Sequence, residues 1–542
     1  MLRSVGLNTL LSKLKPEQAG ARNECLITVS ELAEVYKRYP YLLQNTQNLM
    51  DGCEINFDFN EEKNKTTFLG SLDEDFHKLR EMCYMGLGWR YGRNTTEAIK
   101  RLEKELKVIR EKNFVAYFLT AWDIVEYAKS KGYFHAGRGS GANSIAAYCL
   151  GITEVDPIEL NLYFERFLNM HRSSPPDFDI DFSWKDREDI TSYIFKSNGF
   201  ENTALLGAHS TFQFRAIVRE LGKVYGLPSS EIENLSRTEE IQRRTKKQLV
   251  DNKQDYYKRK ILHFSEKLTK FPQHLTVHSS GIVISDKPMH FYTATDMPPK
   301  GYQTTHFDMY TADKFKMHKL DILSQRGLGH IKDCIKIVKE NRNEDIDINR
   351  VKEFTEDPKL NRLLSVGNSI GCFYIESPAM RQLLRKVRCD KFETLVAASS
   401  IIRPGVSDSG MMRTYIQRVR EPEKYKGIHP KMDEILSETY GVMCYQEDII
   451  RVAHEFAEIP LNGADSLRRA MAWKFRQDNG FEEMEGEFFA NCRRLGYPED
   501  VIQEVWRQME GFAGFSFCKA HSASYAVESY QSLFLKAYYP LE

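Results

Sequence analysis

The chain has 542 residues, of which 42% are hydrophobic and 28% are charged, which excludes disordered and collagen-like chains and predicts several domains. Lys plus Arg and Asp plus Glu each number 76, so the net charge of zero neither favours nor excludes a polyanionic partner. The ten cysteines stand singly, without zinc-type CxxC spacing, and no run of about 20 apolar residues occurs. We therefore expect a cytoplasmic protein with neither a disulfide scaffold nor a transmembrane helix.

Hydrophobic periodicity predicts helices in the first quarter of the chain. Apolar residues recur about every 3.6 positions over 27–51 and 71–131, and the polar stretch 60–66 reads as a linker. Glycines interrupt the pattern at 132–141, with no strand clearly leading into them. A helix of small residues is expected from about Ala142.

The rest of the chain predicts a small sheet followed by a large helical region. Alternating or apolar runs predict strands at 175–183, 281–285 and 316–323. A charged helical stretch, 211–270, lies between the first two strands. The sequence after Gln325 is mostly helical, with loops at 403–411 and 511–521. The class is therefore α+β.

The first strand carries an unusual row of acids. Strict alternation places Asp177, Asp179 and Asp181 on one face and three apolar residues, Phe178, Ile180 and Phe182, on the other. Like charges at this spacing repel one another, and aspartate is a poor strand former. Divalent cations with oxygen ligands would compensate. The alternative is a solvated edge strand guarded by charge.

A later strand adds one acid in an apolar setting. Asp321 stands in the run from Lys316 to Leu323 and needs a partner if it is buried. A third carboxylate would strengthen the metal interpretation. The alternative is a structural ion pair with Lys319 or a nearby arginine.

A glycine-serine turn precedes the acidic strand by 37 residues. In Gly137–Gly141, glycines let the backbone approach a ligand, and a following helix would offer N–H groups to an anion such as a triphosphate. The run is neither a Walker A loop nor a dinucleotide fingerprint. The alternative is a tight turn and cap.

These motifs together resemble one family. GRGSGANSIAAYCLGITEVDPIELNLYFERFLN followed by PPDFDIDF resembles the alpha subunits of bacterial DNA polymerase III, the C-family polymerases. Further matches are HSSGIVIS, HKLDIL, CFYIESPAM, RPG, YGVMCYQEDI, GADSLRRAM and GFSFCKAHSASYA, and the likeness covers about 40–542. It implies a polymerase-beta-like nucleotidyltransferase palm with a mixed sheet, a helical thumb and large, mostly helical fingers.

The resemblance also implies domain boundaries. Residues 1–50 would be the remnant of a preceding domain, 51–208 and 279–326 the palm, 209–278 the thumb, and 327–542 incomplete fingers. Most of the family's N-terminal polymerase-and-histidinol-phosphatase domain and its C-terminal regions would be missing. HSSG (278–281) departs from the family's usual histidine-alanine-glycine-glycine run.

Residue roles follow from the resemblance where motifs match. The catalytic and metal-binding acids would be Asp177, Asp179 and Asp321, with Asp181 outside the metal shell. Nucleotide-binding residues would be Arg138, Gly139, Ser140, Arg166, Lys319, Arg403, Lys519 and His521. DNA-binding residues would be Arg243, Arg244, Lys246, Lys247, Arg468, Arg469 and Lys474. For the arginines and lysines of the fingers the alternative is a solvated charge, and for His521 a packing residue.

The expected function is template-directed addition of deoxynucleotides to a primer 3′-OH during DNA replication, with two Mg²⁺ ions as cofactors. Expected partners are primer-template DNA, deoxynucleoside triphosphates and, in a full-length protein, a sliding clamp and other replisome subunits. Three alternatives stay open: an error-prone relative in damage tolerance, a two-metal nuclease or template-independent transferase, and a fragment that only binds DNA.

Overall fold

The computed structural model describes residues 1–20, 25–54, 57–92, 96–169, 177–242, 256–403, 410–425, 427–471, 480–513 and 517–542. The chain divides into two units, Met1–Asn60 with Gly207–Val277, and Glu61–Leu206 with His278–Glu542. Among the described residues, no helix is both long and apolar enough to cross a bilayer.

The first unit is helical apart from the ends of two strands. Its α-helices are α1 (Leu2–Gly6), α2 (Val29–Val35), α3 (Pro40–Asp51), α9 (Phe214–Tyr225), α10 (Ser229–Gln242) and α11 (Tyr256–Leu268). Helix α9 is amphipathic, and its buried face, including Ile217 and Leu221, packs against α10 and α11 in a small core of its own. The helices predicted within 27–51 are thus confirmed, as are those within 211–270 except over 243–255, which lie outside the described residues.

The second unit is built on a seven-stranded mixed sheet, which confirms the mixed α and β class. The strand order is β1-β2-β7-β4-β3-β6-β5. The bounds are β1 (His135–Arg138), β2 (Phe178–Ser183), β3 (Thr203–Thr211), β4 (Pro272–Ile284), β5 (Thr295–Asp296), β6 (Thr304–Thr305) and β7 (Lys319–Gln325). The boundaries of the two units fall inside β3 and β4.

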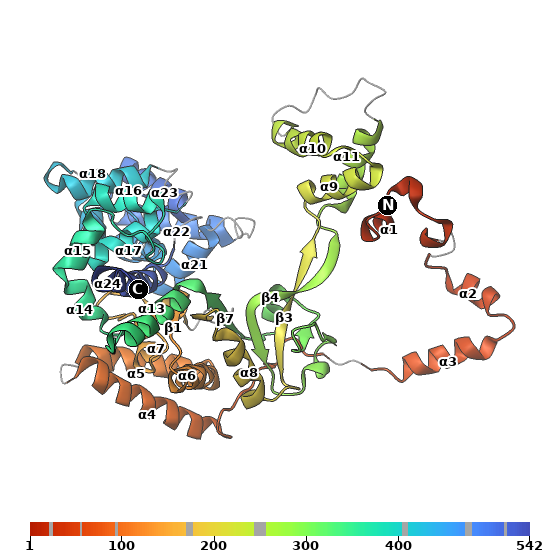
Figure 1. Ribbon diagram of the computed structural model, residues 1–542, viewed down its shortest axis with the longest axis horizontal. Helices are drawn as coiled ribbons and strands as arrows, with labels where there is room; N and C mark the ends of the chain where they lie inside the picture. The colour runs from red at the N-terminus through yellow and green to blue at the C-terminus, as the bar shows by residue number, and fades with distance from the viewer. Residues whose placement is uncertain are drawn as a thin grey trace. The chain divides into compact units, whose positions relative to one another are not determined.

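Five helices pack beside this sheet or against one another near it, coloured orange to yellow in Figure 1. They are α4 (Leu72–Tyr91), α5 (Thr96–Glu111), α6 (Val115–Ser130), α7 (Ile145–Cys149) and α8 (Arg187–Asn198). Helix α4 begins at the N-cap Ser71, whose hydroxyl accepts a hydrogen bond from the Glu74 amide, and acids fill its first turn. Three helices therefore occupy the predicted segment 71–131.

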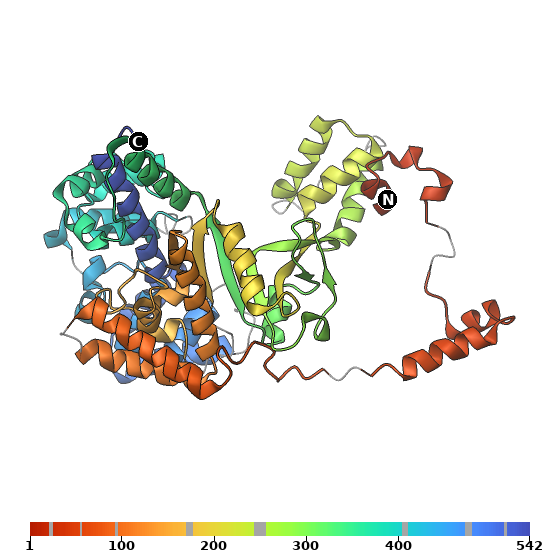
Figure 2. The ribbon, with the colours of Figure 1, turned by 60° about the horizontal axis from the view of Figure 1, so that its bottom comes forward.

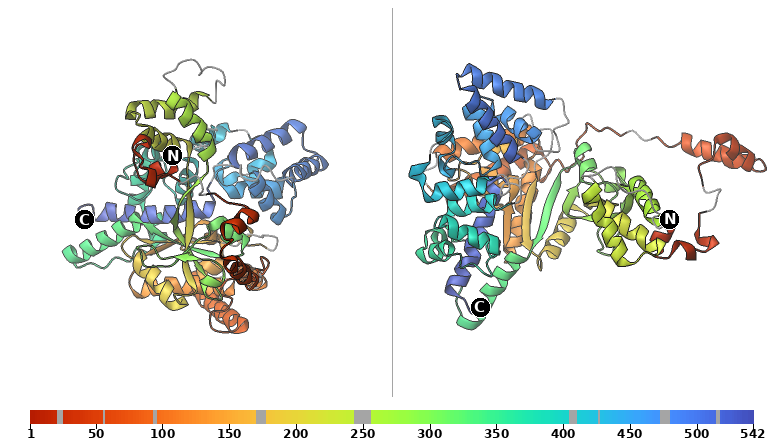
Figure 3. Two further views of the ribbon diagram at one scale, coloured as in Figure 1. Left: turned by 90° about the vertical axis from the view of Figure 1, so that its right-hand side faces the viewer. Right: turned by 90° about the horizontal axis from the view of Figure 1, so that it is seen from above.

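Helix α12 (Met309–Lys314) packs in a small core with residues of β3 and β4. The remaining helices enclose a larger core. They are α13 (Arg326–Arg342), α14 (Val351–Glu356), α15 (Pro358–Ser365), α16 (Pro378–Val387), α17 (Phe392–Ile401), α18 (Met411–Arg420), α19 (Pro430–Ile435), α20 (Gln446–Arg451), α21 (Leu461–Met471), α22 (Gly480–Arg494), α23 (Glu499–Ala513) and α24 (Lys519–Tyr538). Helix α24 is buried along most of its length and contacts α13, α14, α15 and α17 as well as β1 (Figure 2). Figure 3 shows α22 and α23, which pack together, in blue.

Two local predictions are wrong at the glycine-serine turn. A strand, β1, does lead into it, paired antiparallel with β2. The turn itself is a 3₁₀ segment, Gly139–Asn143, and the α-helix begins at Ile145 rather than near Ala142, capped by the Ser144 side chain. Because β1 has four residues, two of them small, its sequence lacks the β-branched pattern that identifies strands.

Candidate active site

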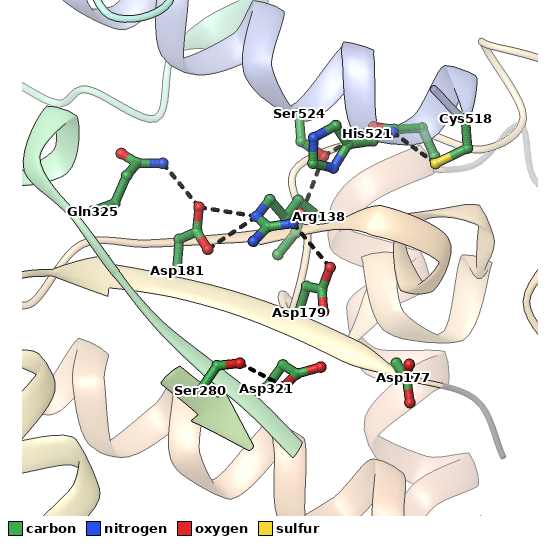
Figure 4. A network of polar contacts seen from close by, with 12 residues as sticks. Arg138, Asp177, Asp179, Asp181, Ser280, Asp321, Gln325, Cys518, His521 and Ser524 are labelled. Carbon is green, nitrogen blue, oxygen red and sulfur yellow. Dashed lines mark hydrogen bonds and ion pairs between the residues drawn. The ribbon is translucent and has the colours of Figure 1, made fainter. Parts of the chain in front are cut away.

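Parallel pairing of β2 and β7 brings the predicted acids together. Asp179 lies opposite Asp321 in the register, and Phe178 lies opposite Leu320. As predicted, Phe178, Ile180 and Phe182 are buried on the other face of β2. The acids therefore occupy one face of two adjacent strands (Figure 4).

Lys319 lies between two of these carboxylates. Its Nζ is 3.0 Å from Asp177 Oδ2 and also donates a hydrogen bond to Asp321 Oδ2. Although burial opposes the charge, Asp177 and Asp321 raise the pKa of Lys319 above its usual value. The ion pair that sequence reasoning offered for Asp321 is thus present, and it includes Asp177.

Arg138 neutralises the other two acids of β2. Its guanidinium donates to Asp179 Oδ2 at 2.9 Å and to both oxygens of Asp181, at 3.0 and 3.1 Å. Burial raises the pKa of Asp179 to about 7, with Arg138 opposing the shift and Asp321 adding to it. Asp181 is 3% exposed, and both of its carboxylate oxygens accept from Arg138.

A buried chain of polar groups continues from Asp181 to α24. Gln325 Nε2 donates to Asp181 Oδ2 at 2.9 Å and to Glu528 Oε2 at 2.8 Å. Burial raises the pKa of Glu528 well above its usual value. No sequence motif identifies Gln325 or Glu528, because their roles depend on contacts between distant segments.

Two hydroxyl groups support the acid-bearing strands. Tyr117 Oη donates to the Lys319 carbonyl at 2.9 Å and accepts from the Phe178 amide at 2.9 Å, so it stands between the first residues of β7 and β2. Ser280 Oγ donates to Asp321 Oδ1 at 2.7 Å. Sequence reasoning missed Tyr117, and noted HSSG as a departure without assigning Ser280 a role.

The donor set suits a hard divalent cation, since Asp179 and Asp321 offer carboxylate oxygens on adjacent strands and Asp177 offers them just before β2. Within the described ranges, however, no three acidic, histidine or cysteine side chains converge on one ion-sized point as they stand. Arg138 and Lys319 already engage these acids. Ions would therefore bind by taking over carboxylate oxygens that the two cations now share.

The glycine-serine turn packs directly on Asp179. Gly139 has a φ of 72°, and a Cβ there would come within 2.8 Å of Asp179 Oδ2. Any side chain at this position would displace the carboxylate. The turn therefore has a structural role as well as its predicted role in nucleotide binding, and Ser140 follows Gly139 on the same turn.

Helix α24 presents His521 near this turn. Ser524 Oγ donates to the Gly137 carbonyl at 3.1 Å, which joins the helix to β1 (Figure 4). His521 is 8% exposed, and its ring lies 4.4 Å from those of both Phe517 and Tyr525. Burial, and then the positive charges of nearby arginines, lower its pKa to about 3; these are Arg138, Arg403 and Arg166.

The cations of the helical region are packed against partners. Lys519 Nζ donates to Glu438 Oε2 and to the Leu160 carbonyl, both at 2.7 Å. Arg166 donates to Gln446 Oε1 at 2.5 Å, and the Arg403 guanidinium lies 3.9 Å from the centroid of the Phe517 ring.

Arg468 and Arg469 share Asp465. Arg468 donates to Asp465 Oδ1 at 2.9 Å, and Arg469 Nε lies 3.2 Å from Oδ2. Burial, together with the charge of Arg166, lowers the pKa of Arg468 to about 10. For Arg468 and Lys519 the solvated-charge alternative is wrong, because both are buried. Five predicted DNA-binding residues lie outside the described residues: Arg243, Arg244, Lys246, Lys247 and Lys474.

Comparison with known proteins gives consistent results. Residues 77–324 match the family described as the bacterial DNA polymerase III alpha NTPase domain, and residues 327–496 match the bacterial DNA polymerase III alpha subunit finger domain. The whole chain aligns with 50% of the length of an error-prone DNA polymerase from Symbiobacterium thermophilum, and 31% of the aligned residues are identical. It also aligns in full with 49% of the length of a DNA polymerase III subunit alpha from Halalkalibacterium halodurans, at 32% identity. A third relative is the DNA polymerase III subunit alpha of Bacillus subtilis. Of this chain, 95% aligns with 46% of that protein's length, at 30% identity. The chain thus spans about half the length of the curated relatives it matches.

Proposed function

Because the chain belongs to the family of bacterial DNA polymerase III alpha subunits, we propose that it is a polymerase core that adds deoxynucleotides to a primer 3′-OH under the direction of a template. The observation that carries this proposal is the register of β2 and β7, which sets Asp179 beside Asp321, with Asp177 linked to Asp321 through Lys319. These acids adjoin the glycine-serine turn, and Arg138, Arg166 and Arg403 lie near His521 at the start of α24, which suits a triphosphate.

The proposed cofactors are two Mg²⁺ ions, held by Asp177, Asp179 and Asp321. When bound, such ions lower the pKa of the primer hydroxyl and balance charge on the phosphates. The residues of the chain orient the reactants. Asp179 and Asp321 would hold their oxygens on one face of the sheet, and Gly139 would leave room for the triphosphate beside Asp179.

The cations around the acids would receive the anionic substrate. Arg138 and Lys319 balance the acids in the absence of ligand, and each could turn to a phosphate oxygen once cations occupy the acids. Arg166, Arg403 and Lys519 would neutralise the β- and γ-phosphates, with Ser140 donating a hydrogen bond. His521 would lie over the sugar. Arg468 and Arg469 would contact the DNA strand.

We propose that the sheet belongs to the polymerase-beta-like palm, formed by 51–208 and 279–326. The thumb would be 209–278, and the unit boundaries at 206/207 and 277/278 support an inserted domain. The fingers would be 327–542, preceded in the chain by a lead-in, 1–50. Partners would be primer-template DNA and deoxynucleoside triphosphates. In a longer protein they would include a sliding clamp and other replisome subunits.

DNA replication is the proposed setting, with an error-prone role in damage tolerance as the second candidate. A DNA polymerase III subunit alpha and an error-prone DNA polymerase match over the whole chain, at 32% and 31% identity. Misincorporation opposite undamaged and damaged templates would separate the two. An error rate that resembles that of error-prone enzymes would move the protein to the second setting.

Primer extension with Mg²⁺ tests the proposed activity directly. Two templates of different sequence are copied with each nucleotide separately, and Asp179→Asn serves as the inactive control. Incorporation that follows the template supports a polymerase. Incorporation that ignores the template indicates a terminal transferase, and primer shortening indicates a nuclease. Tight DNA binding without incorporation, in this chain and in one extended at both ends, would overturn the proposed activity.

A further inference from the structure

A serine hydroxyl bonds directly to the acid of β7. Ser280 lies on β4, whose residue Gly281 pairs with Asp321 in the antiparallel register of β4 and β7. Ser280 Oγ is 2.7 Å from Asp321 Oδ1 (Figure 4), and the two residues are 5% and 6% exposed. The bond is therefore short, charge-assisted and shielded from water.

The two oxygens of Asp321 have different partners. Oδ1 accepts from Ser280, whereas Oδ2 accepts from Lys319 Nζ. A buried carboxylate with a donor on each oxygen is held in one orientation, because rotation would break both bonds at once. Oδ2 is thereby directed toward Lys319 and Asp177, the side on which ions would bind.

The backbone around Ser280 is itself anchored. His278 Nδ1 accepts from the Gly281 amide at 3.0 Å, and Arg187 donates to the Ser279 carbonyl at 2.6 Å. Arg187 also donates to the Ile322 carbonyl at 2.9 Å, so one guanidinium connects the segments of Ser280 and Asp321. The hydroxyl is thus presented from a fixed backbone.

From this geometry we propose that Ser280 is a positioning residue for Asp321, which turns Oδ2 toward the ion-binding side of the cluster. The inference rests on the proposed function. Groups that orient metal-ligating carboxylates typically change metal affinity or activity by about 10- to 100-fold when removed. Ser280 also falls where HSSG departs from the family's usual run, so the hydroxyl is not one that the resemblance itself predicts.

The test compares Ser280→Ala with a matched control, Ser285→Ala. Ser285 directly follows β4 and is 2% exposed, and its hydroxyl bonds to the Asn202 carbonyl at 3.0 Å instead of a carboxylate. Mn²⁺ binding to the unliganded chain is measured by electron paramagnetic resonance, and the Mg²⁺ dependence of single-nucleotide incorporation is measured in parallel. Loss of the Ser280 hydroxyl is expected to weaken Mn²⁺ binding about tenfold and to raise the half-saturating Mg²⁺ similarly. The control should stay within about twofold of wild type.

Thermal unfolding of every variant shows whether it is folded, and Ser280→Gly replaces Ser280→Ala if the latter does not fold. Wild-type Mn²⁺ affinity in a folded variant without the hydroxyl would overturn the inference. The Mn²⁺ measurement needs no catalysis, so it is separate from the proposed activity. If the wild-type chain binds Mn²⁺ and extends no primer, the activity fails while the role of Ser280 is still decided by Mn²⁺ affinity.

Discussion

The acidic face of the sheet and the cationic surroundings of α24 solve opposite electrostatic problems. On β2, β7 and the residue just before β2, four carboxylates face two cations, Arg138 and Lys319; the carboxylates are those of Asp177, Asp179, Asp181 and Asp321. Around the start of α24 the balance is reversed. Among the described residues there, Arg166, Arg403, Arg468, Arg469 and Lys519 are accompanied by four acids, Glu438, Glu447, Asp448 and Asp465.

An excess of buried charge of one sign raises the free energy of the folded chain unless a ligand supplies charge of the opposite sign. Burial raises the pKa of Asp179 and lowers that of Arg468, and a like charge adds to each shift, Asp321 to the first and Arg166 to the second. A divalent cation bound to a triphosphate carries both missing charges. An ion-bound triphosphate would therefore balance both sides, and a variant on either side changes that balance.

The largest effect is expected on the acidic side. Asp177→Asn, Asp179→Asn and Asp321→Asn should each reduce single-turnover incorporation on the order of 10³-fold or more, because each removes a charge that would hold the ions. Metal-free thermal stability should hold or rise, since like charges are removed from one face. Asp181→Asn should be milder, because Asp181 contacts Arg138 and Gln325 instead. Full activity in Asp179→Asn would contradict the role of these acids in holding the ions.

The matching change on the cationic side is Arg166→Gln. Loss of a charge-assisted bond to a phosphate should raise the KM for the incoming nucleotide about tenfold or more, with a smaller change in kcat. Stability should fall by about 1 kcal/mol or more, because relief of repulsion with Arg468 offsets only part of the lost bond to Gln446 and the lost attraction to buried Glu447, 3.9 Å away. Steady-state kinetics and urea unfolding measure the two effects. An unchanged KM would show that the excess positive charge does not serve the nucleotide.

Tyr117→Phe separates geometry from charge on the acidic side, because it alters the backbone contacts of β2 and β7 and removes no charge. Without the hydroxyl the Phe178 amide and the Lys319 carbonyl lose their shared partner, and Asp177 shifts relative to Asp321. The kcat should fall about tenfold, as small misplacements of reacting groups do. Tyr127→Phe on the same helix is the control, since its hydroxyl bonds to Asp189 at 2.9 Å. Equal kcat values for the two variants would contradict this role for Tyr117.

His521 tests whether the cationic side also reads the sugar. If its ring lies over the sugar, His521→Ala should raise ribonucleotide over deoxynucleotide incorporation several-fold, on the order of 1 kcal/mol of discrimination, whereas His521→Phe should not. The ratio of kcat/KM values for the two sugars is the measurement. An unchanged ratio in a folded, active His521→Ala would leave His521 as a packing residue.

The last expected effect concerns pH and stability, with activity left aside. The folded-state pKa of His521 is lowered to about 3 from 6.5, so the folded chain keeps the ring neutral while the unfolded chain gains a proton below pH 6.5. The stability contributed by the neutral ring is present above pH 6.5 and is lost as pH falls, by about 1.4 kcal/mol per pH unit. Urea unfolding from pH 7.5 to 4.5 should show wild type losing about 1.4 kcal/mol per pH unit more than His521→Phe below pH 6.5. The difference between the two slopes isolates His521, because the raised pKa of Asp179 acts in the opposite sense in both proteins. Parallel slopes would mean that the fold does not lower the pKa of His521.

Much of the framework could be predicted from the sequence. The alternation in β2 predicted which residues are buried, and the 3.6-residue period predicted the helices in 71–131, because both depend on local spacing. The row of acids Asp177, Asp179 and Asp181 could be identified because it too depends on local spacing. The strand β1 was missed because its stability comes from pairing with β2, while its own residues have weak strand preference.

The sequence by itself determined the periodic elements, the row of acids on β2 and the resemblance that names the family, since these depend on residues close together in the chain. Tertiary structure alone decided which charges meet. Lys319 reaches Asp177 because β2 and β7 pair in parallel, Ser280 reaches Asp321 because β4 pairs with β7, and Lys519 is buried against Glu438. The physical reason is that a buried charge is stable only with a partner, and that partner can come from any part of the chain that packing brings within hydrogen-bonding distance.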